Sequence, residues 1–123
     1  MATDPIESRI EEIAGQLAPP WEEREERVVE TGAIPIRVHK RGPQYDLEDG
    51  GEAVARARAA GAPDDWLEIA ERVVAEEGFN VNRSGVVFVQ AYEHRDFPRK
   101  VAPLLLRLSD CAAAVQYALL DAA

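Results

Sequence analysis

The sequence has few of the residues that mark disulfide scaffolds, zinc sites and membrane spans. Its 123 residues include one cysteine, Cys111, so an internal disulfide cannot form and no second cysteine supports a zinc site. No run of about eighteen apolar residues occurs, and the segment MATDPIESRIEE carries acidic side chains where a secretory signal is basic and then apolar. These absences predict a cytoplasmic protein that is not inserted into a membrane.

No complete catalytic or nucleotide-binding motif is present either. Gly42 and the Gly50-Gly51 pair are not part of a Gly-Lys-Ser/Thr or Gly-x-Gly-x-x-Gly pattern, so no phosphate loop and no cofactor is predicted. The segment EHRD at 93–96 places a histidine between carboxylates, which suits acid–base chemistry, but no nucleophile elbow or cysteine partner accompanies it. We interpret it as a solvated loop with Asp96 as a helix cap, and favour a protein that is not an enzyme.

Lysine is scarce, with two residues against twelve arginines, and the net charge is -9. The acid lies mainly in two segments: residues 1–31 sum to -6 and residues 46–77 to -7. Because affinity for duplex nucleic acid comes from cations that neutralise phosphates, we expect no duplex binding. The acidic surface should instead bind a basic groove on a protein, or have no partner at all. Two small groups of basic residues could still contact a phosphate together. One group is Arg37, Lys40 and Arg41, and the other is Arg95, Arg99 and Lys100.

The spacing of apolar residues predicts one α+β domain that spans the whole chain, residues 1–123. Helices are expected at about 5–18, at 51–60, in the segment that ends at Gly78, and at 98–121, where Pro103 either delays the start or kinks the helix. Strands are expected at about 26–31, in the alternating segments AIPIRVHK and YDLE, in FNV, and at 86–92. The predicted architecture is an antiparallel sheet of four to five strands packed with about four helices, the last of them long.

The segment VHKRGPQYDLE reads as a β-hairpin with a turn through Arg41-Gly42-Pro43. Its apolar faces stay together only if Val38 lies opposite Tyr45 or opposite Leu47, and the sequence leaves both registers open. In either register Arg37 faces a carboxylate on the second strand, a cross-strand pairing worth at most about 1 kcal/mol. The charged residues of this segment therefore need no catalytic explanation.

Three carboxylates at the end of this hairpin, Asp46, Glu48 and Asp49, form a candidate metal site. Alternate strand positions place the first two on one face, and Mg²⁺ prefers carboxylate oxygens, so the alternative function is a metal-dependent hydrolase or nuclease. A restriction-type nuclease would also place a lysine on the next strand, in a Glu-x-Lys pair that this sequence lacks. We favour the interpretation that Asp49-Gly50-Gly51 makes a turn and caps the next helix.

The closing helix is expected to have two apolar faces. One should pack on the sheet, with Cys111 as a small buried hydrophobe, and consists of Val101, Leu105, Leu108, Ala112, Val115 and Leu119. The second, called here the outer sector, is the candidate interaction surface and consists of Leu106, Ala113, Tyr117 and Leu120. Two interpretations are open: the first helix covers the sector, which we favour, or a two-fold homodimer buries it with Tyr117 as an anchor.

The order of these segments resembles domain-of-unknown-function family 1828, which comprises small prokaryotic and phage domains. The resemblance covers about residues 34–121. It is carried by a Leu-x-Asp-Asp-Gly-like turn and a Phe-Pro at the start of the last helix, here Leu47, Asp49, Gly50, Phe97 and Pro98. The chain departs from the pattern at Glu48 and Gly51. The resemblance implies a fold and a prokaryotic setting, and no activity.

These observations together predict an interaction or regulatory module that works by binding another macromolecule. The absence of a complete catalytic set and the segregated charge carry this hypothesis. A protein is the expected partner, and the hypothesis links the module to phage or genome-defence functions in a prokaryote.

Overall fold

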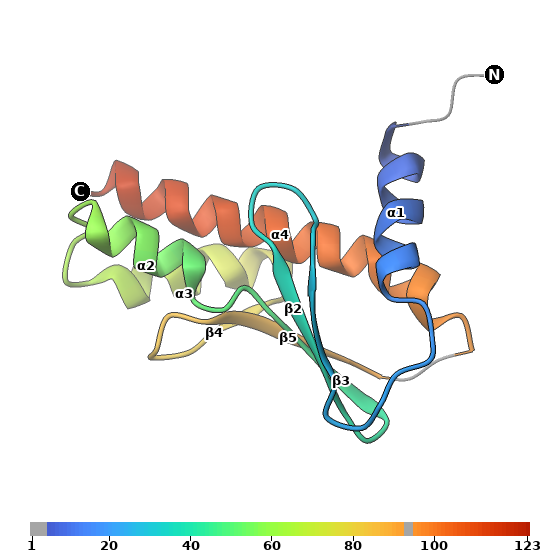
Figure 1. The fold of residues 1–123 in the computed structure, drawn as a ribbon. Helices are drawn as coiled ribbons and strands as arrows, with labels where there is room; N and C mark the ends of the chain where they lie inside the picture. Colours follow the sequence, from blue (N-terminus) through green and yellow to red (C-terminus); the bar gives the residue numbers. More distant parts are fainter. Residues whose placement is uncertain (1–4, 93–94) are drawn as a thin grey trace.

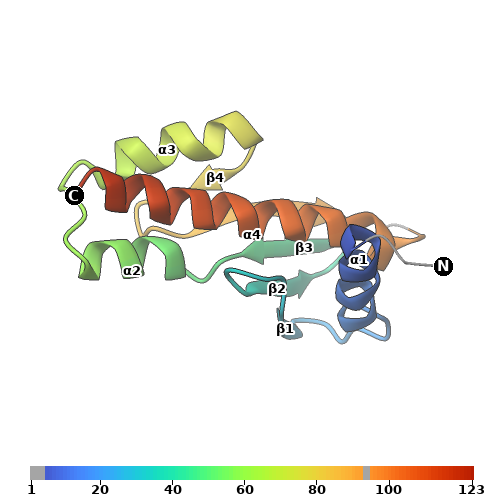
Figure 2. The same ribbon diagram turned by 90° about the horizontal axis from the view of Figure 1, so that it is seen from above.

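A computed structural model describes residues 5–92 and 95–123, so Asp4, Glu93 and His94 lie outside the described residues. Four helices pack on one face of a five-stranded antiparallel sheet, which confirms the predicted α+β class (Figures 1 and 2). In chain order the elements are α1 (Pro5–Gln16), β1 (Glu26–Val29), β2 (Ile36–Arg41), β3 (Gln44–Glu48), α2 (Glu52–Ala59), α3 (Trp66–Glu77), β4 (Asn80–Val81), β5 (Val87–Tyr92) and α4 (Phe97–Asp121). No described helix has the length and apolar character needed to cross a membrane.

The sheet has the strand order β1-β2-β3-β5-β4, and its central hairpin takes one of the two predicted registers. Val38 lies opposite Leu47, which leaves Gly42 and Pro43 as the two turn residues. Gly42 has a φ of 58°, the positive value that the first central position of such a turn requires. In the other register Arg41 would occupy that position, where a side chain is unfavourable. Turn geometry therefore explains the choice.

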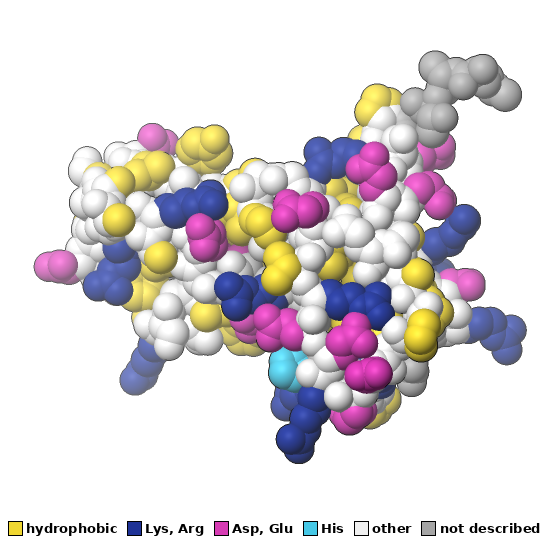
Figure 3. All heavy atoms as spheres, in the orientation of Figure 1, with side chains coloured by type: hydrophobic (Ala, Val, Ile, Leu, Met, Phe, Trp, Pro, Cys, Tyr) yellow, Lys and Arg dark blue, Asp and Glu magenta, His cyan; other side chains and the backbone are white. Residues whose placement is uncertain are grey.

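The face of the sheet opposite the helices is open to solvent and strongly polar. Neighbouring strands bring Glu26, His39, Asp46 and Gln90 into one row across this face. In Figure 3 acidic and basic side chains lie interspersed around the end of the β2–β3 hairpin. This is the usual pattern of an antiparallel sheet that is covered on one side only.

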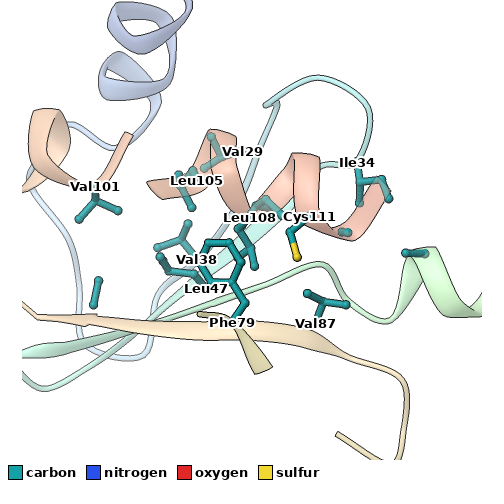
Figure 4. Packing of buried hydrophobic residues seen from close by; sticks show 14 of the residues in the cluster. Val29, Ile34, Val38, Leu47, Phe79, Val87, Val101, Leu105, Leu108 and Cys111 are labelled. Carbon is teal, nitrogen blue, oxygen red and sulfur yellow. The ribbon is translucent and has the colours of Figure 1, made fainter. Parts of the chain in front are cut away.

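The core lies between the other face of the sheet and α4. The six residues predicted to form the inner face of α4 are all buried: Val101, Leu105, Leu108, Ala112, Val115 and Leu119. Figure 4 shows several of them converging with Val38 and Leu47 from the strands and with Phe79. α4 begins at Phe97 and continues through Pro103, so the proline does not delay its start, although it removes one backbone N–H donor from the helix.

Candidate interaction surfaces

Asp46 and Glu48 lie on the open face of the sheet because they alternate along β3 with the buried Leu47. Asp46 faces His39 across the strands and Glu48 faces Arg37. Both carboxylates are therefore available to solvent, and both meet a basic side chain of β2.

The two carboxylates have opposite electrostatic environments. Burial by itself raises the pKa of Asp46, but hydrogen bonds from Arg41 (3.1 Å) and Gln44 (2.9 Å) outweigh it and hold the pKa below its ordinary value. For Glu48, burial raises the pKa and the Glu26 carboxylate raises it further, against the opposing effect of Arg37. Asp46 is thus held as a paired anion, whereas Glu48 is the more easily protonated of the two.

Asp49 has a structural role and points away from this face. Its side chain is 3% exposed and accepts backbone N–H bonds from Gly51 (2.8 Å), Ala53 (3.2 Å) and Val87 (2.9 Å). The first two bonds satisfy donors at the start of α2, and the third joins this turn to β5. Asp49 therefore fixes the β3–α2 turn, as the preferred interpretation of the sequence expected.

The three predicted metal ligands are consequently not brought together. Within residues 5–92 and 95–123 no group of three or more His, Cys, Asp or Glu side chains is arranged to hold a metal ion. The oxygens of Asp49 already accept three hydrogen bonds, and Asp46 is paired with Arg41. The geometry of these carboxylates favours folding and charge pairing over metal chemistry.

The other candidates for reactive chemistry are Cys111 and the segment 93–96. Cys111 is buried on α4, and burial together with the Glu77 carboxylate raises the pKa of its thiol to about 11. It therefore stays a neutral thiol near pH 7. Of the segment 93–96, only Arg95 and Asp96 are described, and Asp96 occupies the N-cap position of α4 without a side-chain capping bond.

Four of the six predicted basic side chains lie within 4 Å of an acidic neighbour. Their ion pairs are Arg37 with Glu26 (3.8 Å), Lys40 with Glu23 (3.9 Å), Arg41 with Asp46 (2.5 Å) and Arg99 with Glu11 (3.4 Å). Little uncompensated positive charge is thus left on these side chains for a phosphate to bind. That the chain does not bind duplex nucleic acid stays a prediction.

The outer sector of α4 divides into a covered and an exposed part. Leu106 lines a hollow together with Ile6 and Ile10 of α1. Ala113 and Leu120 are partly buried and pack against the core. Tyr117 is 68% exposed. Figures 1 and 2 both place α1 at the N-terminal end of α4, so α1 covers only the beginning of the sector.

A corner between α1 and α4 is the feature that the sequence did not predict. The N-terminal half of α1 projects beyond α4, and Ile6 there is 64% exposed. Ile13 near the other end of the helix, and Leu17 just after it, are buried. The apolar walls of a hollow of about 330 Å³ are called here the α1–α4 corner and consist of Ile6, Ile10, Pro103 and Leu106. Figure 3 shows hydrophobic atoms at the projecting tip of α1.

Polar contacts hold α1 in this projecting position. The Arg9 guanidinium donates to the Thr31 carbonyl, and the Gln16 side chain donates to the Glu30 carbonyl (3.2 Å) and accepts from its amide (2.9 Å). Arg27 on β1 donates to the Gln16 carbonyl (3.0 Å) at the end of the helix. These hydrogen bonds attach one side of α1 to β1 and to the residues that follow β1.

Comparisons with known proteins leave the geometry as the basis for assigning a function. The resemblance to domain-of-unknown-function family 1828 stays a prediction. No family model, no curated protein and no solved structure matches this chain.

Proposed function

We propose that the chain is a protein-interaction module whose docking site is the α1–α4 corner. The observation that carries the proposal is the apolar stripe of α1, which extends beyond the core that it packs on. Ile13 and Leu17 at one end of the stripe are buried, but Ile6 at the other end is 64% exposed. Ile6 is directed, with Ile10, toward a hollow that its own chain leaves open.

Exposed large hydrophobic side chains are few in the part of the chain that the structure describes, and this makes their placement informative. They are Ile6, Val28, Tyr92 and Tyr117. Val28 and Tyr92 lie at opposite sides of the open sheet face, separated by the charged residues of β2 and β3. Ile6 instead lines the hollow with three other apolar residues, Ile10, Pro103 and Leu106. Exposed apolar surface gathered in this way typically marks an association site.

The rim of the corner carries charges of both signs, with Arg9, Arg107 and Asp110 around the apolar walls. Such a polar rim around an apolar centre is the usual anatomy of a specific protein interface. The charges also favour a partner with its own mixture of acidic and basic groups over a uniformly charged polymer.

The experiment compares tagged wild-type chain with Ile6→Glu and with Val28→Glu in affinity capture from lysate of the source cells. Val28→Glu is the matched control because Val28 is similarly exposed, at 56%, on the other face of the molecule. We expect wild type and Val28→Glu to retain the same protein, identified by mass spectrometry, and Ile6→Glu to lose it. Equal retention by Ile6→Glu would contradict the assignment of the corner as the docking site.

A further inference from the structure

We propose that the occupant of the corner is α4 of a second copy of this chain, in a two-fold dimer centred on Ala114. This inference rests on the proposed function and names its partner.

The exposed surface of α4 has a straight, narrow crest. Pro103, Asp110, Ala114 and Asp121 are spaced by seven, four and seven residues, which places them within about 20° of one line along the helix. Asp110, Ala114 and Asp121 are exposed and Pro103 is partly buried. A small residue at the middle of the crest lets a second helix approach closely there.

The charges along this crest are self-complementary when two copies run antiparallel. Arg107 and Asp121 are each seven residues from Ala114, so a two-fold axis at Ala114 places Arg107 of one copy opposite Asp121 of the other, twice. Arg107 donates one hydrogen bond to the Glu77 carbonyl (3.2 Å), which leaves further guanidinium donors for this pairing.

The same axis provides a partner for the exposed tyrosine of the outer sector. Asp110 lies four residues before Ala114 and Tyr117 three residues after it, on the same side of the crest. Antiparallel pairing therefore brings the Tyr117 hydroxyl of one copy within reach of the Asp110 carboxylate of the other. Tyr117 then supplies an anchor with a polar tip, of the kind that interfaces favour.

The apolar corner receives the end of the partner helix in this arrangement. The last turn of α4 from the second copy, with Leu120, lies over the first copy's crest near Leu106. Leu120 is only partly buried within its own chain, as are Leu106 and Ile10. The contact covers these side chains together with Ile6, which is 64% exposed.

The helices that flank α4 are also complementary in charge. α1 and α2 lie on the same side of α4 at its opposite ends (Figure 2). A two-fold axis across the middle of α4 makes the two copies of this helix run antiparallel, with the same side of each helix facing the same way. α1 at one end of the first copy therefore comes beside α2 of the second copy. α1 carries the exposed acids Glu7 and Glu12. α2 carries the exposed base Arg58, whereas its Arg56 is paired with Glu52 of the same helix (3.0 Å).

The flanking contact is also needed for an interface of sufficient size. The crest from Pro103 to Asp121 is about 27 Å long and about 10 Å wide, or roughly 270 Å² in projection. A stable dimer buries ~800 Å² on each partner, about one ninth of the 7330 Å² surface of this chain. The crest alone is therefore too small, and the proposed dimer requires the two α1–α2 contacts to bury the rest.

The first test measures the mass of the full-length chain by sedimentation equilibrium for wild type, Ala114→Arg and Ala75→Arg. Ala75 is the matched control because it is exposed on α3 and follows an acid, Glu71, by four residues, as Ala114 follows Asp110. We expect a dimer for wild type and Ala75→Arg, and at least a ~100-fold weaker dimer for Ala114→Arg, since two bulky like charges then meet at the axis. Circular dichroism shows whether each variant keeps its helices.

The second test locates the two-fold axis, and its result does not depend on whether Ala114→Arg folds. Ala114→Cys should oxidise to a disulfide-linked dimer, because a disulfide joins Cα atoms roughly 4.4–6.8 Å apart and the axis brings the two copies of residue 114 together. Ala75→Cys should stay monomeric on a denaturing gel, and the buried Cys111 should not react. Asp121→Arg should weaken the dimer about 3–10-fold, and adding Arg107→Asp should restore it.

The outcomes separate this inference from the proposed function. A wild type that is monomeric at high micromolar concentration overturns the second-copy assignment, and loss of lysate capture in Ile6→Glu would still support docking at the corner. A wild-type dimer that Ala114→Arg leaves intact, with no disulfide from Ala114→Cys, overturns the proposed axis.

Discussion

Ser109 on α4 and Ile34 in the β1–β2 loop exchange two hydrogen bonds across 75 residues of sequence. The Ser109 hydroxyl donates to the Ile34 carbonyl (2.7 Å) and accepts from the Ile34 amide (3.3 Å). The Thr31 hydroxyl donates to the same carbonyl (2.8 Å), and both hydroxyl side chains are buried. These bonds satisfy the backbone of a loop that would otherwise bring unpaired polar groups into the core.

Ser109→Ala should lower the free energy of unfolding by about 1–3 kcal/mol, because the buried Ile34 amide loses its acceptor. Urea unfolding measures the change. Ser84→Ala, in the exposed turn between β4 and β5, is the control and should stay within about 0.5 kcal/mol of wild type. Equal effects of the two substitutions would show that the Ser109 bonds contribute nothing.

Asp49→Asn should destabilise the fold by about 2–3 kcal/mol, since an amide cannot accept all three backbone N–H bonds that the carboxylate accepts. Asp46→Asn on the exposed face should cost less than about 1 kcal/mol. Urea unfolding of both variants tests this order.

Calorimetric titration with Mg²⁺ and with Mn²⁺ tests the metal hypothesis on the same two variants. We expect no tight binding to wild type, because Asp49 is occupied by backbone donors. Tight binding that disappears in folded Asp46→Asn and Asp49→Asn would reverse this conclusion and support a metal-dependent enzyme.

Glu48→Gln should stabilise the protein by roughly 0.2–0.5 kcal/mol at neutral pH, and the gain should vanish at low pH. The pKa of Glu48 is raised in the fold above its ordinary value of 4.5, first by burial and then by Glu26. The folded state therefore binds this proton more tightly, and stability is lost as pH rises through the raised pKa. Unfolding curves at neutral pH and below the ordinary pKa measure the difference; a gain of equal size at both pH values would exclude ionisation as its cause.

Tyr117→Ala should change the free energy of unfolding by less than about 0.5 kcal/mol, because the side chain is mostly exposed. It should nevertheless weaken self-association about tenfold through loss of the anchor. Tyr92→Ala, similarly exposed on the open sheet face, should change neither quantity. Urea unfolding and sedimentation equilibrium separate the two effects, and association that survives in Tyr117→Ala unchanged would remove the tyrosine from the interface.

Random duplex DNA should not bind with micromolar affinity at physiological salt. The net charge is -9 and the basic side chains near the hairpin are paired with acids, so few cations are free to release counterions from phosphate. Fluorescence anisotropy of a labelled duplex measures the affinity. Micromolar binding that falls steeply with salt would contradict the prediction.

Much of the fold follows from local patterns in the sequence. Gly78 after the stripe of α3 predicts a left-handed cap, and it has a φ of 76° with the amide of Phe79 bonded to the Val74 carbonyl (2.9 Å). Alternation in β2 and β3 predicts which side chains are buried. The register between them needed the turn geometry as well, because both alternatives kept the apolar faces together.

The candidate sites were less accessible to such reasoning. The turn Asp49-Gly50-Gly51 indicated a capping role, but the bond from the Val87 amide joins residues 38 positions apart, and no local signal marks it. The exposed end of α1 was missed for a similar reason. The stripe of Ile6, Ile10, Ile13 and Leu17 predicts an apolar helix face, yet periodicity does not say how much of that face reaches the core.

The sequence by itself determined the class of fold, the helix and strand periods, the buried face of α4 and the acidic surface, because each depends on residues close together in the chain. The tertiary structure alone decided the strand order, the buried position of Asp49 and the crossing of α1 over α4. Those features depend on contacts between segments that are distant in the chain. The open corner is the geometric consequence of that crossing.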